Sequence, residues 1–206
     1  MNRPDIESVT DCIILAGGEG RRMGGPKALL EVNGSTLIER QFQLLSPLFD
    51  NMFVSLKDVS ILDKTSPLPW QGTIADPPGA RCLLDVIGNA IGKVGRPVFL
   101  AAVDVPALNR SIVSEICSQH SKEQSVVPVD EKRPQPLAAV WDPAALEVLE
   151  PPDEDLALLA WVRRTGAMLL KWPDDFPLSS AENQRPEHPF RNLNTPEDLR
   201  GMESQE

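Results

Sequence analysis

The sequence has little of what several common classes of site and fold require. Its 206 residues contain three cysteines, at Cys12, Cys82 and Cys117, and only two histidines. This small, scattered set excludes a disulfide framework and a zinc site of ordinary ligand spacing, so we expect reduced cysteines and a cytoplasmic protein. No run approaches the roughly eighteen apolar residues of a membrane span. Residues 1–10 are polar, so we expect no secretory leader either.

Positive charge is also in short supply. The chain has 20 Lys and Arg against 30 Asp and Glu, which gives a formal net charge of −10. A nucleic-acid-binding face needs a basic surface, so we expect no nucleic acid and no membrane among the partners. A polyanionic nucleotide stays compatible with this balance, because a local positive pocket and a divalent metal can neutralise it.

What the sequence does have is a regular alternation of strand and helix patterns. Its 206 residues, 41% of them apolar, suit a single domain over 1–206 with a core at about 11–200. The expected strands are 12–15, 52–56, 73–75, 97–103, 125–129, 136–141 and 167–172. The expected helices are 36–45, 82–91, 111–120, 143–149, 155–165 and a short one from 195. This order predicts a three-layer α/β/α sandwich with a Rossmann-like, mostly parallel sheet.

The most informative segment is the glycine-rich loop that follows the first strand and ends at Lys27. Glycines allow backbone N–H groups to approach an anion, and Arg21, Arg22 and Lys27 add positive charge. Two better-known phosphate loops fit poorly: Met23 replaces the third glycine of a dinucleotide fingerprint, and Ala28 replaces the Ser or Thr of a Walker loop. The choice is therefore between another kind of phosphate loop and a structural turn.

This loop resembles the L-A-(G/A)-G-x-G-x-R-M-G-x-x-K signature of nucleotidyltransferases. The double glycine is most similar to the molybdenum cofactor guanylyltransferases, the MobA-like family, whereas cytidylyl-transferring relatives more often have Ala-Ala-Gly. The resemblance implies a fold of the nucleotide-diphospho-sugar transferase type, with Lys27 and Arg22 catalytic. It also implies that the nucleotide is bound by Leu15, Ala16, Gly17, Gly18, Gly20 and Lys27.

Two aspartates follow expected strands and are candidates for the same site. Asp104 comes after the strongest apolar run, where open α/β sheets place their ligands, and a carboxylate there suits Mg²⁺. The resemblance implies that Asp104 is catalytic, contacts the nucleotide and holds magnesium, and that Asp76 lies near the ribose and base. The alternatives are a capping or salt-bridged Asp104 and a turn-forming Asp76.

The remaining candidates are polar residues near two other strand ends. Family members often end the second strand with an Asn that contacts the nucleotide; Ser55 and Lys57 are the nearest polar residues here, and we assign Ser55 to that role. The resemblance implies that Asn192 and Asn194, in an N-x-N-T-P motif, bind the acceptor. A strand-to-helix turn capped by Thr195 explains the same motif structurally.

Together these features predict a Mg²⁺-dependent guanylyltransferase that joins GMP from GTP to molybdopterin, giving the guanine dinucleotide and pyrophosphate. Expected partners are GTP, molybdopterin or the molybdenum cofactor, and proteins of molybdoenzyme maturation. Residues 79–85 lack a glycine that the family usually has, which leaves open other acceptors (cobinamide phosphate, a sugar phosphate) and CTP as donor. A nucleotide-sensing module without catalysis and a dinucleotide-binding oxidoreductase are the alternatives from other classes.

Overall fold

The computed structural model describes residues 9–18, 20, 24–149, 157–176, 188–195 and 197–198. Within them, one sheet has eight strands and a separate hairpin has two. The strands are β1 (Asp11–Leu15), β2 (Glu31–Val32), β3 (Ser35–Thr36), β4 (Asn51–Leu56), β5 (Gly72–Ala75), β6 (Val98–Ala102), β7 (Val126–Asp130), β8 (Arg133–Pro134), β9 (Ala138–Trp141) and β10 (Met168–Lys171). The order in the large sheet is β10-β7-β9-β6-β1-β4-β5, and β8 pairs with β7.

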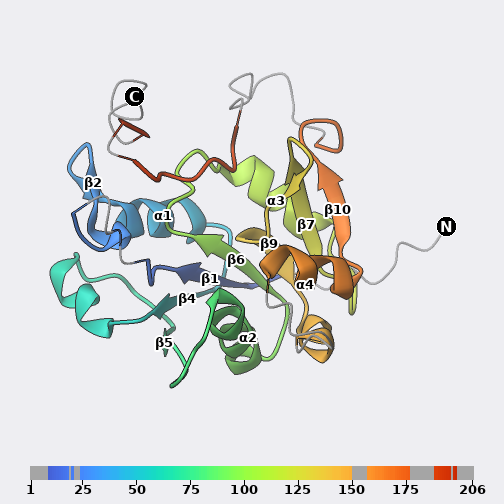
Figure 1. The fold of residues 1–206 in the computed structure, drawn as a ribbon. Helices are drawn as coiled ribbons and strands as arrows, with labels where there is room; N and C mark the ends of the chain where they lie inside the picture. Colours follow the sequence, from blue (N-terminus) through green and yellow to red (C-terminus); the bar gives the residue numbers. More distant parts are fainter. Residues whose placement is uncertain are drawn as a thin grey trace.

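The half of the sheet that surrounds β1 is wholly parallel. β1 lies between β4 and β6, and β5 extends the same side. All five residues of β1 and of β6 are buried, as expected for strands covered on both faces. The carboxyl ends of β1, β4, β5 and β6 therefore meet at one edge of the sheet (Figure 1).

The other half contains the exception to the parallel order. β9 runs antiparallel to β6 and β7, whereas β10 is parallel to β7. The short connection from β7 through β8 to β9 reverses the chain, so β9 cannot enter the sheet in the parallel sense. The prediction of a mostly parallel sheet in a three-layer α/β/α sandwich is confirmed.

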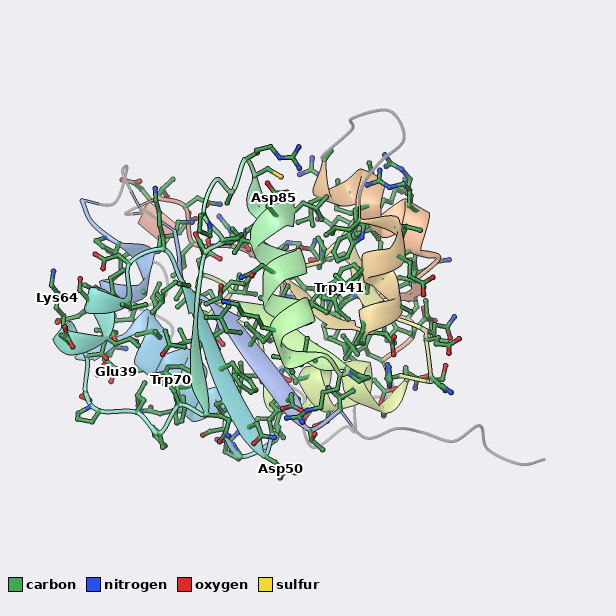
Figure 2. The ribbon with its side chains drawn as sticks, turned by 90° about the horizontal axis from the view of Figure 1, so that it is seen from below. Glu39, Asp50, Lys64, Trp70, Asp85 and Trp141 are labelled. Carbon is green, nitrogen blue, oxygen red and sulfur yellow. The ribbon has the colours of Figure 1, made fainter. Side chains whose placement is uncertain are left out.

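Helices cover both faces of this sheet. They are α1 (Leu37–Leu45), α2 (Leu83–Val94), α3 (Arg110–Ser118) and α4 (Leu158–Thr165), with 3-10 helices η2 (Lys27–Leu29), η3 (Val59–Lys64) and η4 (Pro143–Val148). α1 and α3 share one apolar core, and α2, α4 and η4 share the other, on the opposite face (Figure 1). Figure 2, from below, shows α2 in front of the sheet with Trp141 beside it. Trp141 is fully buried and stacks on Trp161, so it is a core residue.

Local signals in the sequence explain where several helices begin and end. Thr36 and Glu39 form a capping box at the start of α1, where a helix is expected from residue 36. The Glu39 carboxylate accepts hydrogen bonds from the backbone of Thr36 and Ser66, which lowers its pKa to about 2. α4 ends at Gly166, which has the left-handed backbone that stops a helix.

Some boundaries differ from the expectations. The expected helix at 143–149 is the 3-10 helix η4, and the part of the expected 155–165 helix before residue 157 lies outside the described residues. The β2–β3 hairpin was not expected, although Asn33-Gly34, both at positive φ, is a strong hairpin signal. No helix among the described residues is long and apolar enough to cross a membrane.

Candidate nucleotide site

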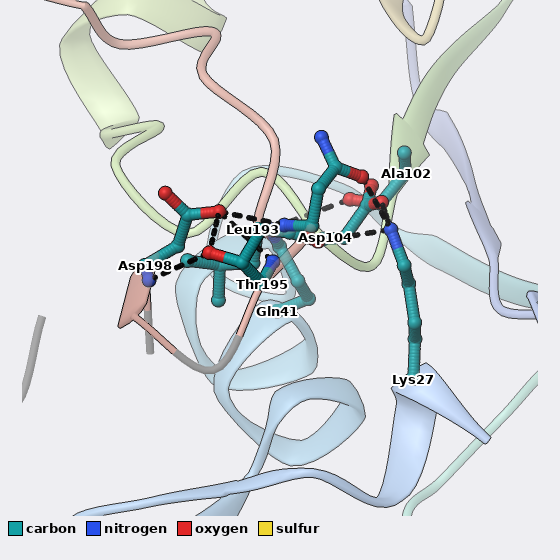
Figure 3. A network of polar contacts seen from close by, with 8 residues as sticks. Lys27, Gln41, Ala102, Asp104, Leu193, Thr195 and Asp198 are labelled. Carbon is teal, nitrogen blue, oxygen red and sulfur yellow. Dashed lines mark hydrogen bonds and ion pairs between the residues drawn. The ribbon is translucent and has the colours of Figure 1, made fainter. Parts of the chain in front are cut away.

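Lys27 lies at the centre of the site at the carboxyl edge of the sheet. Its Nζ donates to Asp104 Oδ2 at 2.5 Å, to the Leu193 carbonyl oxygen at 2.9 Å and to Asn194 Oδ1 at 2.9 Å. Figure 3 shows these contacts converging on the ammonium from two separate segments. An ammonium has three N–H donors, so all of them are matched in this state. The structure thus brings together three residues that the sequence placed 77 and 167 positions apart.

The glycine-rich loop holds Lys27 in this position. The Lys27 backbone N–H donates to the Gly18 carbonyl at 3.1 Å, and the Lys27 side chain passes over Gly18. A Cβ at Gly18 would lie 3.5 Å from Lys27 Cδ, which is ordinary contact. Gly20 has φ of +55°, and a Cβ there would overlap the backbone oxygen of Gly25. The loop closure therefore requires glycine at position 20.

The predicted catalytic Arg22 lies outside the described residues, as do Arg21 and Met23. The start of the loop is well defined: Leu15 ends β1, and the Ala16 backbone N–H donates to the Ser55 carbonyl at 2.9 Å. The parallel ladder between β1 and β4 therefore continues to the first residue of the loop. This fixes the direction in which the loop leaves the sheet.

Asp104 sits in a turn that three other parts of the chain hold in place. The Val103 backbone N–H donates to the Leu15 carbonyl at 3.0 Å, and the Leu193 N–H donates to the Asp104 carbonyl at 2.8 Å. Gln41, a buried residue of α1, donates from Nε2 to the Val105 carbonyl at 2.8 Å. The Asp104 side chain retains 13% exposure, so its carboxylate is fixed yet open to a ligand.

A second aspartate, Asp198, holds Asn194 and Thr195 in place. Asp198 Oδ2 accepts from the backbone N–H of Asn194, from the N–H of Thr195 and from Thr195 Oγ1, each at 3.0 Å (Figure 3). Hydrogen bonds from Asn194 and Thr195 outweigh the opposing effect of burial and lower the pKa of Asp198. The capping contact predicted for Thr195 is present, since Thr195 Oγ1 accepts from the Asp198 N–H. Asn192 is half-buried and is not among the hydrogen-bond acceptors of Lys27 in the described part of the chain.

Asp76 lies at the end of β5, on the other side of the glycine-rich loop. It is half-buried, and burial raises the pKa of its carboxyl group, while the nearby Lys57 charge opposes the shift. Its Oδ1 is buried and has no hydrogen-bond partner among the described residues. Such a carboxylate is costly to leave ionised without a ligand.

Ser55 and Lys57 occupy the end of β4 beside Asp76. Ser55 is 1% exposed and its Oγ lacks a hydrogen-bond partner in the described part of the chain, so its assignment to the nucleotide stays a prediction. Lys57 is exposed and was not among the predicted site residues. Its position directly after a parallel strand, where ligands bind, is the signal that could have found it.

The chain is similar to known proteins along most of its length. Residues 12–168 match the family model of the MobA-like NTP transferase domain. The chain is 30% identical to the probable molybdenum cofactor guanylyltransferase of Methanosarcina mazei, over 95% of this chain and 90% of that protein. It is 28% identical to the molybdenum cofactor guanylyltransferase of Nitrobacter hamburgensis, over 92% and 91%.

Solved structures support the same type of fold. The molybdopterin-guanine dinucleotide biosynthesis protein A from Archaeoglobus fulgidus superposes with a TM-score of 0.76 at 22% identity, covering 95% of this chain and 97% of that one. The 2-C-methyl-D-erythritol 4-phosphate cytidylyltransferase from Thermus thermophilus gives a TM-score of 0.60 at 16% identity, covering 96% and 98%. The fold of the nucleotide-diphospho-sugar transferase type is therefore confirmed.

Proposed function

Because the chain belongs to the MobA-like NTP transferase family and is thus a nucleotidyltransferase, we propose that it transfers GMP from GTP to the phosphate of molybdopterin. The products are the guanine dinucleotide form of the cofactor and pyrophosphate. The names of the curated relatives support this donor and acceptor. The observation that carries the proposal is the Lys27–Asp104 contact of 2.5 Å at the mouth of the glycine-rich loop.

Lys27 is placed to stabilise negative charge on the triphosphate. In nucleotidyl transfer the acceptor attacks the α-phosphorus and pyrophosphate leaves, so charge grows on the leaving group and on the equatorial oxygens. The backbone N–H groups of Gly17, Gly18 and Gly20 offer further donors for these oxygens. To bind phosphate, the Lys27 ammonium must exchange at least one of its three present acceptors. No covalent intermediate with the protein is needed, because the acceptor phosphate attacks in line.

Asp104 fits a magnesium ion that arrives with the nucleotide. Mg²⁺ prefers hard oxygen ligands and is often held by one or two carboxylates together with substrate phosphates. Among the described residues, no group of three or more His, Cys, Asp and Glu side chains is placed to hold a metal ion. Asp104 would hold the ion, and the ion would neutralise charge on the phosphate oxygens.

Asn194 connects this centre to the proposed acceptor. Its side-chain oxygen accepts a hydrogen bond from Lys27 and its backbone N–H donates to Asp198, so Asn194 joins the Lys27 centre to the residues around Asp198. We propose that Asn194, with Asn192 two residues before it, contacts molybdopterin. Arg22 completes the proposed catalytic set by adding a second positive charge to the loop.

The test is product formation from GTP and molybdopterin with Mg²⁺, in the wild type and in Lys27→Met and Asp104→Asn. Removal of one such charge-stabilising group lowers turnover by about 10²- to 10³-fold. Lys64→Met and Asp63→Asn, at exposed positions of η3, are matched controls and should keep full activity. Binding of GTP without product would favour a sensing module, and preference for CTP would overturn the choice of donor.

A further inference from the structure

Two of the three acceptors of the Lys27 ammonium come from neighbouring residues, Leu193 and Asn194. The Leu193 carbonyl oxygen and Asn194 Oδ1 each accept from Lys27 Nζ at 2.9 Å. The peptide unit that joins the two residues carries this carbonyl together with the Asn194 N–H, and it is planar, so both groups turn together. A contact that fixes the Asn194 N–H therefore also fixes the carbonyl that faces Lys27.

Asp198 supplies that contact. Its Oδ2 accepts from the Asn194 N–H at 3.0 Å, and it also accepts from the N–H and the Oγ1 of Thr195 at 3.0 Å each (Figure 3). The acceptors of Lys27 in the described part of the chain do not include Asp198. An effect of Asp198 on Lys27 therefore passes through the Leu193–Asn194 peptide.

The two oxygens of the Asp198 carboxylate have different roles. Oδ1 accepts from Arg191 Nη2 at 3.0 Å, and Arg191 is 69% exposed, so this ion pair contributes little. Oδ2 makes the contacts to Asn194 and Thr195. The hydrogen bond from the Asn194 backbone is the largest cause that lowers the pKa of Asp198, so the carboxylate is an ionised acceptor at neutral pH. Oδ2 is therefore the atom that joins Asp198 to the site.

The position of the Lys27 ammonium matters because a lysine side chain is flexible. Its charge stands at the end of a four-carbon stem with freely rotating bonds. In the proposed reaction a phosphate oxygen replaces at least one of the present acceptors, and the acceptors that remain determine where the ammonium lies. Because two of the three belong to residues that Asp198 holds, Asp198 has a large share in that position.

We propose that Asp198 is a positioning residue of the nucleotidyl transfer and places the Lys27 ammonium through the Leu193–Asn194 peptide. This inference rests on the proposed function, in which Lys27 stabilises charge on the triphosphate, and adds a residue that acts through others. The reciprocal bonds between Thr195 and Asp198 are also an ordinary helix cap. The experiments must therefore separate the placement of Lys27 from a contribution to folding alone.

The first test observes the Lys27 ammonium directly and needs no nucleotide. NMR of the full chain with isotope-labelled lysine detects Nζ signals, and the signal lost in Lys27→Met belongs to Lys27. An ammonium with all three donors matched exchanges its protons slowly with water, so the wild type should show this signal and Asp198→Ala should lose it. Arg191→Met, which removes only the ion pair at Oδ1, should keep it. A slowly exchanging Lys27 signal in Asp198→Ala would overturn the inference.

The second test compares kcat in Asp198→Ala, in Lys27→Met and in the double variant. Asp198→Ala should lower kcat by about 10- to 100-fold, because a displacement of about 1 Å at a reacting centre costs up to roughly 10²-fold. In the Lys27→Met background the same change should have no further effect, since no ammonium is left to place. An equal loss in both backgrounds is the signature of a purely structural Asp198 and would contradict the proposal.

Asp198→Asn is the conservative variant for the same assay. Its amide oxygen can replace Oδ2 as the acceptor, so it should regain most of the kcat that Asp198→Ala loses. Arg191→Met is the matched control for the lost ion pair and should keep the wild-type kcat. Melting temperatures establish that each variant is folded. An Asp198→Asn variant as slow as Asp198→Ala would contradict a role carried by the hydrogen bonds of Oδ2.

Failure of the inference and failure of the proposed function give different results. If the wild type makes no product from GTP and molybdopterin, yet Asp198→Ala loses the Lys27 signal, guanylyl transfer is wrong and the placement of Lys27 by Asp198 stands. If the wild type makes product, and neither the signal nor kcat depends on Asp198, the proposed function stands and the inference is wrong.

Discussion

Two ion pairs at opposite edges of the sheet differ in how their cations and carboxylates meet, and one of them lies in the proposed nucleotide site. At the amino edge, Arg96 binds Asp11 with two hydrogen bonds, Nε to Oδ2 at 2.6 Å and Nη2 to Oδ1 at 2.7 Å. At the carboxyl edge, Lys27 donates to one of the two carboxylate oxygens of Asp104, Oδ2, in the described part of the chain. Its ammonium also donates to the Leu193 carbonyl oxygen and to Asn194 Oδ1. The first pair uses both carboxylate oxygens of Asp11, whereas Lys27 uses one oxygen of Asp104 among the described residues.

The chemistry of the two cations fits this contrast. A guanidinium is a planar fork that matches a carboxylate in one geometry, whereas an ammonium is a point charge that can change partners. Asp11 is fully buried, which would raise its pKa, but hydrogen bonds from Arg96 and Thr10 outweigh burial and lower it. Arg96 therefore stabilises the fold, and the Lys27 ammonium suits the catalytic role proposed for it.

The largest effects are expected when each of the two cations is removed in turn. Lys27→Met should lower turnover by about 10²- to 10³-fold with little change in melting temperature. Arg96→Met should lower the melting temperature with little change in turnover, because it leaves the buried Asp11 carboxylate unpaired. Thermal denaturation and product assays on the same preparations check both halves. Equal loss of activity in the two variants, at equal folded fraction, would contradict the division into structural and functional pairs.

Gly20→Ala tests whether GTP binding depends on the conformation of the glycine-rich loop as well as on Lys27. A side chain at position 20 would meet the Gly25 oxygen and strain a backbone at positive φ, at a cost of about 1–3 kcal/mol. We expect a roughly tenfold or larger loss of GTP affinity, measured by calorimetry, because the strain falls on the loop proposed to bind the phosphates. Gly24→Ala, also at positive φ but with no atom within 4 Å of its Cβ, is the matched control for backbone strain without a clash.

The smallest expected effect concerns the opposite pKa shifts of two aspartates. The pKa of Asp11 is lowered, so its charge stabilises the fold at neutral pH, and this contribution is lost as pH falls below its usual value of 3.8. Burial raises the pKa of Asp76, so its charge destabilises the ligand-free fold at neutral pH, and this cost is relieved as pH falls through the raised pKa. At pH 7, Asp11→Asn should therefore lower the melting temperature and Asp76→Asn should raise it slightly. A lower melting temperature in both variants would show that the Asp76 carboxylate is stabilised by the protein without a ligand.

The sequence predicts which residues lie at the carboxyl edge of the sheet better than it predicts the other tertiary contacts. The glycine-rich loop and the aspartate after the buried β6 have local signatures, and the resemblance joined both to Asn194, so Lys27, Asp104 and Asn194 were expected in one site. The structure adds the contacts between them, which depend on where Leu193 and Asn194 lie relative to the carboxyl edge. Arg22 stays a prediction, since it lies outside the described residues.

The contacts that were not predicted depend on tertiary pairing. The Arg96–Asp11 pair and the proximity of Lys57 to Asp76 require knowing that β1 lies between β4 and β6 and that β5 lies beside β4. The apolar pattern of residues 138–141 is the same in either strand direction, so it could not reveal that β9 is antiparallel. Pattern and propensity describe single elements, and neighbours in the sheet are decided by packing.

The most direct test of the central claim is calorimetric titration of GTP with Mg²⁺ into the wild type, Asp104→Asn and Arg96→Met at a temperature where all three are folded. The account predicts binding by the wild type and by Arg96→Met with similar affinity, and a loss of at least about tenfold for Asp104→Asn, which removes the carboxylate proposed to hold the metal. Unchanged affinity in Asp104→Asn, with weakened binding in Arg96→Met, would contradict the assignment of the nucleotide site to the carboxyl edge of the sheet.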